Sequence, residues 1–383
     1  MAGWRTVRRV VAGGAALAAA GWVLREIPAE LGVRPLASGP DRAERIQRSP
    51  QFRDGSFYNP MPEPTHVGAP EPAMLRELAR DRAQRRPAGM VPLMAPPSDP
   101  PPPAGLRAVW YGHATTMVEI EGRRVMFDPV WSNRVSPSRL VGPRRHHPLP
   151  AELGDLPQLD AIVISHDHYD HLDMATVRSL TRTQRAPFLV PLGIGAHLER
   201  WGVPLYRIIE LDWDEEAEVA GLRFVSTAAR HFSGRSLRRN DTLWGSWVVA
   251  GRTKRVFYAG DSGYFEGYKS IGAAHGPFDL ALMPIGAYSP AWPDIHMNPE
   301  EAVTAATDLG ASLLLPVHWA TFSLALHPWV EPIDRLWREA RARQVPIVVP
   351  RPGQGVDTEA VPEVDTWWEP LGATAPTFTA DRL

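Results

Sequence analysis

Short apolar segments separated by turns recur along the chain from Arg107 onward, and they predict a protein rich in β-strand. The first two, residues 107–120 and 123–130, are joined by the tight turn Glu121-Gly122 and form a hairpin. The later segments are five to eight residues long, which is typical of strands rather than helices. They cover residues 161–165, 187–191, 205–211, 222–228, 244–251, 255–260, 280–286, 312–317 and 346–350.

Helical segments alternate with these strands, at residues 175–183, 195–200, 299–309 and 333–344. The third has the clearest start signal. Asn298 can cap it, Pro299 suits the first helical position, and two glutamates in the first turn favour the helix dipole. Mixed strands with helices on the outside predict a layered α/β domain of about 250 residues, spanning 105–355.

The N-terminal end differs in composition from this domain. Three arginines in residues 1–9 precede the uncharged apolar run Val10 to Leu24, so residues 1–25 resemble an export signal or membrane anchor. The alternative is an alanine-rich helix docked on the domain. The run falls short of the roughly 20 residues that cross a bilayer, which favours a secretory signal over a transmembrane helix. We expect an exported or membrane-associated protein of the cell envelope, and a cytoplasmic one otherwise.

Residues 26–104 form an N-terminal extension that ends in a proline-rich arm. Eight prolines lie within residues 87–105, and they favour an extended, polyproline-like backbone. The arm is either a free linker or a segment wrapped on the domain, and Met90, Val91, Leu93 and Met94 favour wrapping because apolar side chains gain from burial. Residues 356–383 follow the domain as a C-terminal tail.

The composition excludes several kinds of chemistry. The 41 Lys and Arg residues are balanced by 43 Asp and Glu, so the formal charge is −2 and no overall positive field attracts nucleic acid. The chain has no cysteine, which excludes thiolate metal ligands and a cysteine nucleophile. A metal would therefore be bound by histidine, aspartate or glutamate.

Side chains of these types gather in the segment HDHYDH, residues 166–171, directly after the predicted strand 161–165. Three further candidates follow other predicted strands. Strand ends position side chains accurately, and the loops beyond them give access. We expect a centre for two metal ions, Zn²⁺ above all, with Mn²⁺ or Fe as alternatives. The expected ligands are His166, His168 and His231 for one ion, Asp170, His171 and His318 for the other, and Asp261 as a bridge.

Several nearby residues have expected supporting roles. Asp128 and Asp167 should accept hydrogen bonds from ligating imidazoles, which usually donate their second N–H to a carboxylate. His113 is expected either to support a ligating imidazole in the same way or to cap its hairpin. Four aromatic residues are expected to line an acyl-chain groove or, as the plainer alternative, to pack in the core: Trp292, Trp319, Phe322 and Trp329.

The HDHYDH segment, with the later His231, Asp261 and His318, resembles the signature of metallo-β-lactamase-fold hydrolases. That family implies an αββα sandwich with a binuclear metal site at one edge. Stretches such as GHATTMVEI, ISHDHYDHLD, YAGDSGY and PVHWATFSLA look more specifically like N-acyl-phosphatidylethanolamine-hydrolysing phospholipase D and its bacterial relatives. The similarity covers about Gly105 to Gln354, and a second, shorter similar stretch lies at residues 48–60.

The resemblance implies that the seven ligands carry over to this chain, with Asp261 and Asp170 in catalytic roles. His296 lies in the stretch that corresponds to the family's active-site loop, where it is expected to contact the phosphate or the leaving group. The surrounding PAWPDIHMN departs from the family's loop, so the alternative is a polar loop residue before a helix.

Two cations that share a water lower its pKa and hold phosphoryl oxygens, so that hydroxide can attack phosphorus in line. The resemblance then implies a zinc-dependent phosphodiesterase acting on N-acyl-phosphatidylethanolamine-like phospholipids at a membrane surface. The alternatives are a nuclease resembling ribonuclease Z, a sugar-phosphate lactonase, or a non-catalytic metal-binding envelope protein. The net charge argues against nucleic acid as a partner. The sequence is compatible with a homo-oligomer.

Overall fold

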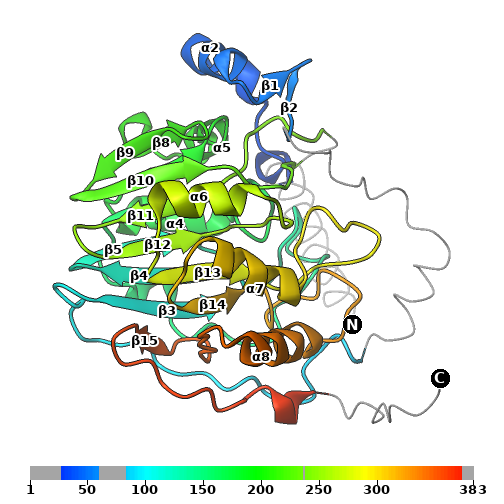
Figure 1. Ribbon diagram of the computed structural model, residues 1–383. Coiled ribbons are helices and arrows are strands. Elements are labelled where there is room, and N and C mark those ends of the chain that lie inside the picture. Colours follow the sequence, from blue (N-terminus) through cyan, green and yellow to red (C-terminus); the bar gives the residue numbers. More distant parts are fainter. Residues whose placement is uncertain (1–26, 60–82, 236–237, 373–383) are drawn as a thin grey trace, which may run out of the picture.

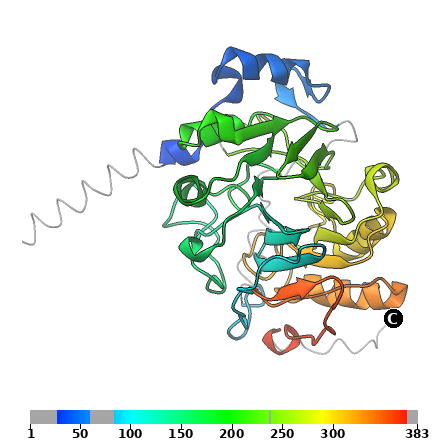
Figure 2. The same ribbon diagram turned by 90° about the vertical axis from the view of Figure 1, so that its left-hand side faces the viewer.

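Two mixed β-sheets lie face to face with helices on their outer surfaces (Figure 1). The computed structural model describes residues 27–59, 83–235 and 238–372. In Figure 2 the green helices lie on one side of the sheets and the yellow and orange helices on the other. The expectation of a layered α/β sandwich is confirmed.

The seven-stranded sheet has the order β15-β3-β4-β5-β6-β7-β8. Its strands are β3 (Leu106–Gly112), β4 (Thr115–Ile120), β5 (Arg123–Phe127), β6 (Ala161–Val163), β7 (Phe188–Pro191), β8 (Ile208–Leu211) and β15 (Gly355–Asp357). The prediction of one strand over residues 107–120 is wrong. The chain folds back at His113-Ala114 to form β3 and β4, because Gly112 (φ 108°) and His113 (φ 53°) leave the extended conformation.

The six-stranded sheet has the order β14-β13-β12-β11-β10-β9. Its strands are β9 (Glu216–Val219), β10 (Leu222–Thr227), β11 (Ser246–Ala250), β12 (Arg255–Tyr258), β13 (Leu280–Pro284) and β14 (Leu314–Val317). The strand expected at residues 346–350 is reduced to one isolated bridge between Ile347 and Leu314. Pro346 and Pro350 lack the N–H groups that a longer ladder needs.

The four expected helices are present within two residues of the predicted ends, as α4 (Met174–Thr183), α5 (Gly195–Arg200), α7 (Pro299–Asp308) and α8 (Glu331–Arg343). Asn298 and Glu301 form the capping box that starts α7. The helix α6 (Gly267–His275) was not predicted, since its two glycines weaken the helical signal. The extension adds η1 (Pro35–Ala37), α2 (Pro40–Arg48), β1 (Phe52–Arg53) and β2 (Ser56–Phe57), and short turns form η2 (Leu153–Asp155), η3 (Leu205–Arg207) and η4 (Glu369–Leu371).

The seven-stranded sheet is buried on both faces, which explains why its strands are nearly continuous apolar runs. Successive side chains of a strand point to opposite faces. Trp110 and Val118 accordingly join the core between the two sheets, whereas Val109 and Met117 join the core under α4 and α5. A packed core therefore lies on each face of this sheet and holds the strand ends in place.

The segments outside the predicted domain pack against it. In the proline-rich arm, Val91 is 5% exposed and belongs to the main core, while the Met94 N–H donates to the Pro352 carbonyl at 2.9 Å. The arm is thus wrapped on the domain, although Met90 is 92% exposed. Beyond residue 355, Trp367 and Trp368 are buried in the same core.

Residues 1–25, expected to be a signal or anchor, lie outside the described residues. Within the described ranges, no helix has both the length and the apolar character needed to cross a membrane.

Candidate metal centre

The candidate ligands meet at one edge of the sandwich because several strands end there in the same direction. β5 and β6 are parallel, as are β12, β13 and β14. β10 points the same way as β12, since both are antiparallel to β11. His166 follows β6, His231 follows β10, Asp261 follows β12 and His318 follows β14. The structure brings all seven expected ligands together.

Three imidazoles form the first group. The Nδ1 atom of His168 lies 2.9 Å from Nε2 of His166 and 3.3 Å from Nε2 of His231. The His231 Nδ1–H donates to the Ile295 carbonyl at 2.8 Å, which leaves Nε2 with its lone pair. Burial holds the pKa values of His166 and His231 well below the usual range. These rings are therefore neutral, as metal ligands must be.

The second group surrounds Asp170. Its Oδ2 atom lies 3.1 Å from Nε2 of His318 and 3.4 Å from Nε2 of His171. Burial lowers the pKa of His318, but the carboxylates of Asp261 and Asp170 outweigh it and raise the pKa to about 9. The carboxylates of Asp170 and Asp261 therefore stabilise positive charge at this position. A metal ion bound here would replace the proton on the His318 ring.

Asp261 lies between the two groups. Its Oδ2 atom is 3.1 Å from Nε2 of both His171 and His318, and 3.8 Å and 3.9 Å from Nε2 of His166 and His231. Burial would raise the pKa of Asp261, yet the surrounding imidazoles hold it well below the usual value. One ionised carboxylate thus faces both groups, as a bridge between two ions requires.

The donor set fits two cations of the zinc type. Ligands about 2.0–2.1 Å from a tetrahedral Zn²⁺ are separated from one another by about 3.3 Å, close to the spacings within each group. The buried atoms His171 Nε2 and Asp261 Oδ1 have no hydrogen-bond partner within the described chain. Buried polar atoms are rarely left without partners, and a metal ion bound here would provide a partner for both.

Asp128 has the supporting role that the sequence predicted. Its Oδ2 atom accepts a hydrogen bond from Nδ1 of His171 at 2.6 Å, which turns Nε2 toward the centre. The same carboxylate accepts from the Ser165 backbone N–H at 2.7 Å and from the Tyr258 hydroxyl at 2.5 Å. Asp128 is fully buried, so these bonds fix the position of the His171 ring.

The prediction for Asp167 is wrong. Its carboxylate accepts from the Gly234 N–H at 2.7 Å and lies 3.4 Å from Nε2 of His197, instead of contacting a candidate ligand. In the extended turn, residues 166 and 168 point to one side, so the intervening side chain points away. Asp167 anchors the loop that follows His231.

His113 belongs more closely to the centre than the sequence indicated. Its Nε2 atom lies 2.9 Å from Oδ2 of Asp170, and its backbone carbonyl accepts the N–H of His318 at 3.0 Å. The turn after β3 lies at the ligand-bearing edge because β3 and β5 are both antiparallel to β4. His113, Asp128 and His318 all have positive φ, between 38° and 62°, and such strain is typical of functional sites.

His296 also reaches the centre. Its Nδ1 atom is 3.9 Å from Oδ2 of Asp261, and its ring centre lies 5.1 Å from that of His231 and 5.3 Å from that of His318. Burial lowers the pKa of His296 to about 4, so the ring is neutral. Its position beside both groups allows contact with a bound substrate.

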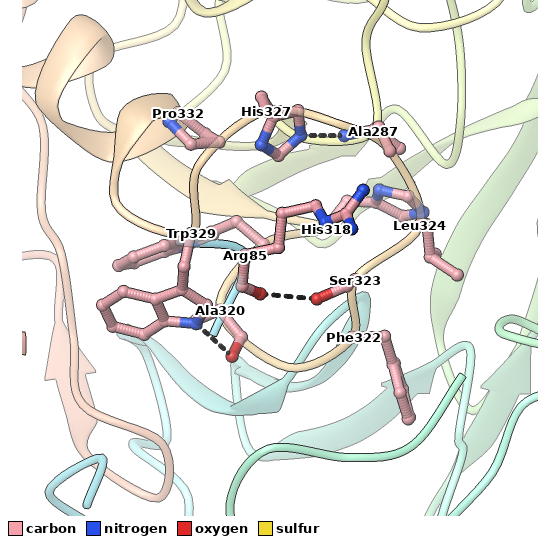
Figure 3. Close-up of a pocket in the computed structure, with 12 residues that line it drawn as sticks. Arg85, Ala287, His318, Ala320, Phe322, Ser323, Leu324, His327, Trp329 and Pro332 are labelled. Carbon is pink, nitrogen blue, oxygen red and sulfur yellow. Dashed lines mark hydrogen bonds between the residues drawn. The ribbon is translucent and has the colours of Figure 1, made fainter. Parts of the chain in front are cut away.

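A small, open pocket is lined in part by His318 (Figure 3). Figure 3 shows Arg85, which lies in the N-terminal extension just before the proline-rich arm, extending toward His318. Three of the candidate groove aromatics, Trp319, Phe322 and Trp329, line it. Trp319 also stacks on Trp110 with ring centres 5.6 Å apart, so it serves the core as well.

Comparison with known families extends this picture. A family model described as the beta-lactamase superfamily domain matches residues 123–319. An uncharacterised protein of Mycobacterium tuberculosis is 50% identical over 372 residues, covering 95% of this chain and 99% of that protein. The N-acyl-phosphatidylethanolamine-hydrolyzing phospholipase D 1 of Caenorhabditis elegans is 38% identical, covering 63% of this chain and 71% of the worm protein.

Among solved structures, a metallo-hydrolase from the archaeon Ignicoccus hospitalis has a similar fold. The TM-score is 0.51 at 24% identity, over 66% of this chain and 97% of the archaeal chain. At this identity the likeness supports the fold alone. It agrees with the layered sandwich described above.

Proposed function

Because this chain belongs to the beta-lactamase superfamily and is a metal-dependent hydrolase, we propose that it is a binuclear zinc phosphodiesterase. Its proposed substrates are phospholipids of the N-acyl-phosphatidylethanolamine type. The observation that carries the proposal is the placement of Asp261 Oδ2 between two compact groups of metal-binding atoms.

The proposed ligands divide as the two groups do. His166, His168 and His231 would hold one ion, Asp170, His171 and His318 would hold the other, and Asp261 would be available to both. Nitrogen and oxygen donors of this kind suit Zn²⁺, and Mn²⁺ and Fe are compatible with them. His113 positions Asp170 through the 2.9 Å contact.

When bound, two such cations acidify a shared water and neutralise phosphoryl oxygens. In the proposed reaction, a new bond forms between the water oxygen and phosphorus, and the bond from phosphorus to the ethanolamine oxygen breaks. The leaving alkoxide takes a proton, yielding phosphatidic acid and an N-acylethanolamine. The neutral ring of His296 lies where it can donate a hydrogen bond to the leaving oxygen.

The lipid substrate is supported by two observations. The worm relative, whose name states hydrolysis of N-acyl-phosphatidylethanolamine, is 38% identical. The pocket beside His318 combines aromatic walls with Arg85, and these side chains suit a substrate that has both apolar chains and a phosphate. We expect the enzyme to act at a membrane surface of the cell envelope, with residues 1–25 as its signal or anchor.

The test is a substrate comparison with purified, zinc-loaded full-length chain in H₂¹⁸O. The proposal requires loss of N-acyl-phosphatidylethanolamine and ¹⁸O in the phosphatidic acid, with both effects abolished by a chelator. Asp261→Asn is the matched inactive variant. RNA cleavage would favour the nuclease alternative, and hydrolysis of a sugar-phosphate lactone the lactonase. Either result without lipid turnover would overturn the lipid assignment.

A further inference from the structure

The segment between β5 and η2 is strongly basic. Residues 129–151 contain four arginines and no aspartate or glutamate, although the whole chain has a slight net negative charge. Two of the arginines, Arg139 and Arg144, are exposed. The positive charge of this segment is therefore available at the surface, where it favours an anionic partner.

The middle of the segment forms a defined projection, residues 136–142, which we name the tip loop. Arg134 and Arg144 pair as an antiparallel bridge at its base, and the Val135 N–H donates to the Pro143 carbonyl at 3.2 Å. Gly142 closes the loop at φ 113°, where an added Cβ would lie 2.5 Å from the side chain of Ser136. The conformation of the tip loop thus requires a glycine at position 142.

The tip loop exposes apolar side chains. Leu140 is 74% exposed and Val141 71%, among the largest exposures of apolar residues in the described chain. Adjacent exposed apolar residues flanked by arginines favour insertion at a lipid surface, because the apolar atoms enter the acyl region while the cations meet anionic head groups.

The base of the tip loop stands beside the metal centre. Val130 and Val135 pack on Phe322, whose ring centre lies 5.2 Å from that of His113. A surface that meets the tip loop is therefore next to the ligand-bearing edge.

We propose that the tip loop docks the enzyme on an anionic lipid bilayer, with Leu140 and Val141 inserted and Arg139 and Arg144 on the head groups. The inference deepens the proposed function and rests on it for the choice of a bilayer over a protein partner. Docking at this edge would bring the metal centre close to lipid head groups.

The absence of cysteine allows a direct test in the full chain, because one introduced cysteine is the sole labelling site. Leu140→Cys carries an environment-sensitive fluorophore, and Tyr206→Cys serves as the control. Tyr206 is 86% exposed and precedes β8, at the opposite edge of the sheet. With phosphatidylcholine–phosphatidylglycerol vesicles, emission from position 140 should shift to the blue and be quenched by bromolipids, while position 206 stays unchanged.

Vesicle partition provides the second measurement. The double variant Leu140→Ser, Val141→Ser should lower the partition coefficient on these vesicles by about tenfold, whereas Leu205→Ser, Tyr206→Ser should leave it unchanged. Zinc content and melting temperature verify the fold. An unshifted probe at position 140 overturns the proposal, as does a change of oligomeric state in the tip-loop variant, which would indicate a protein interface. Docking without lipid hydrolysis would retain this inference and refute the substrate.

Discussion

Replacement of Asp128 by asparagine tests whether the centre depends on a carboxylate that is not itself a proposed ligand. Asp128 Oδ2 accepts from His171 Nδ1 and from the hydroxyls of Ser165 and Tyr258, while Oδ1 accepts from the Ser165 N–H. An asparagine presents one oxygen and one NH₂ group to these four donors. At least one donor must then face another donor, whichever way the amide is turned.

The size of the effect follows from this geometry. Loss of a carboxylate that orients a ligating imidazole typically weakens metal binding 10- to 100-fold, which corresponds to about 1.4–2.7 kcal/mol. The unsatisfied donor at a fully buried site should cost a further 1–3 kcal/mol or so of folding free energy. We expect Asp128→Asn to fold, to lose zinc at lower chelator concentrations, and to recover activity when zinc is added.

The assay is zinc competition with a chromophoric chelator, combined with turnover of a soluble phosphodiester and a melting curve. Asp160→Asn is the matched control. Asp160 also accepts a backbone hydrogen bond, from the Arg124 N–H at 2.9 Å, but it precedes β6 at the opposite edge from the centre. If Asp128→Asn bound zinc as tightly as the control, the orientation of His171 would not depend on this carboxylate and the reasoning would fail.

Four further predictions follow from the same structure. Elemental analysis of freshly purified protein should find about two zinc equivalents per chain, and one or none would contradict the binuclear centre. Asp261→Asn should lower phosphodiester turnover by orders of magnitude because it removes the charge between two cations, and near-normal turnover would exclude Asp261 from the site. Deletion of residues 1–25 should preserve hydrolysis of a soluble diester but reduce turnover of vesicle lipid, whereas loss of soluble activity would support the docked-helix alternative. Glu121→Gln should destabilise the fold by about 1–3 kcal/mol at pH 7. Burial raises the pKa of Glu121, but the N–H groups of residues 252–254 outweigh it and lower the pKa to about 2. The stabilisation is therefore present above the usual carboxyl pKa and lost as pH falls toward 2, so denaturant titrations should converge with wild type in strong acid.

The sequence was informative where local pattern and chemistry coincide. The gathering of the candidate ligands could be predicted because each follows an apolar strand, and the strands that precede them, from both sheets, end at the same edge of the sandwich. The start of α7 could be predicted because Asn298 and Glu301 act within four residues of each other. The helix cap depends on residues close together in the sequence, and the meeting of the candidate ligands depends on strand direction.

Features that depend on contacts distant in sequence could not be predicted in the same way. His113 lies 57 residues before Asp170, its partner, and the GHAT segment looked like the middle of a strand. The burial of Trp367 and Trp368 depends on a core built from both sheets, and the adjacent prolines and acidic residues gave the segment the composition of a tail. Asp167 was misplaced because a run of ligand-type residues does not indicate which side chains face inward.

Parts of the chain outside the matched family domain contact the candidate site. The family match covers residues 123–319, yet Arg85 of the N-terminal extension lines the pocket beside His318. Glu30 accepts a hydrogen bond from Arg235 at 2.9 Å, next to the loop that follows His231. The candidate ligands thus lie within the matched domain, while the extension contributes Arg85 to the pocket beside His318. Arg85→Ala should therefore change KM for lipid more than zinc affinity, since Arg85 lines the pocket but is not a proposed ligand.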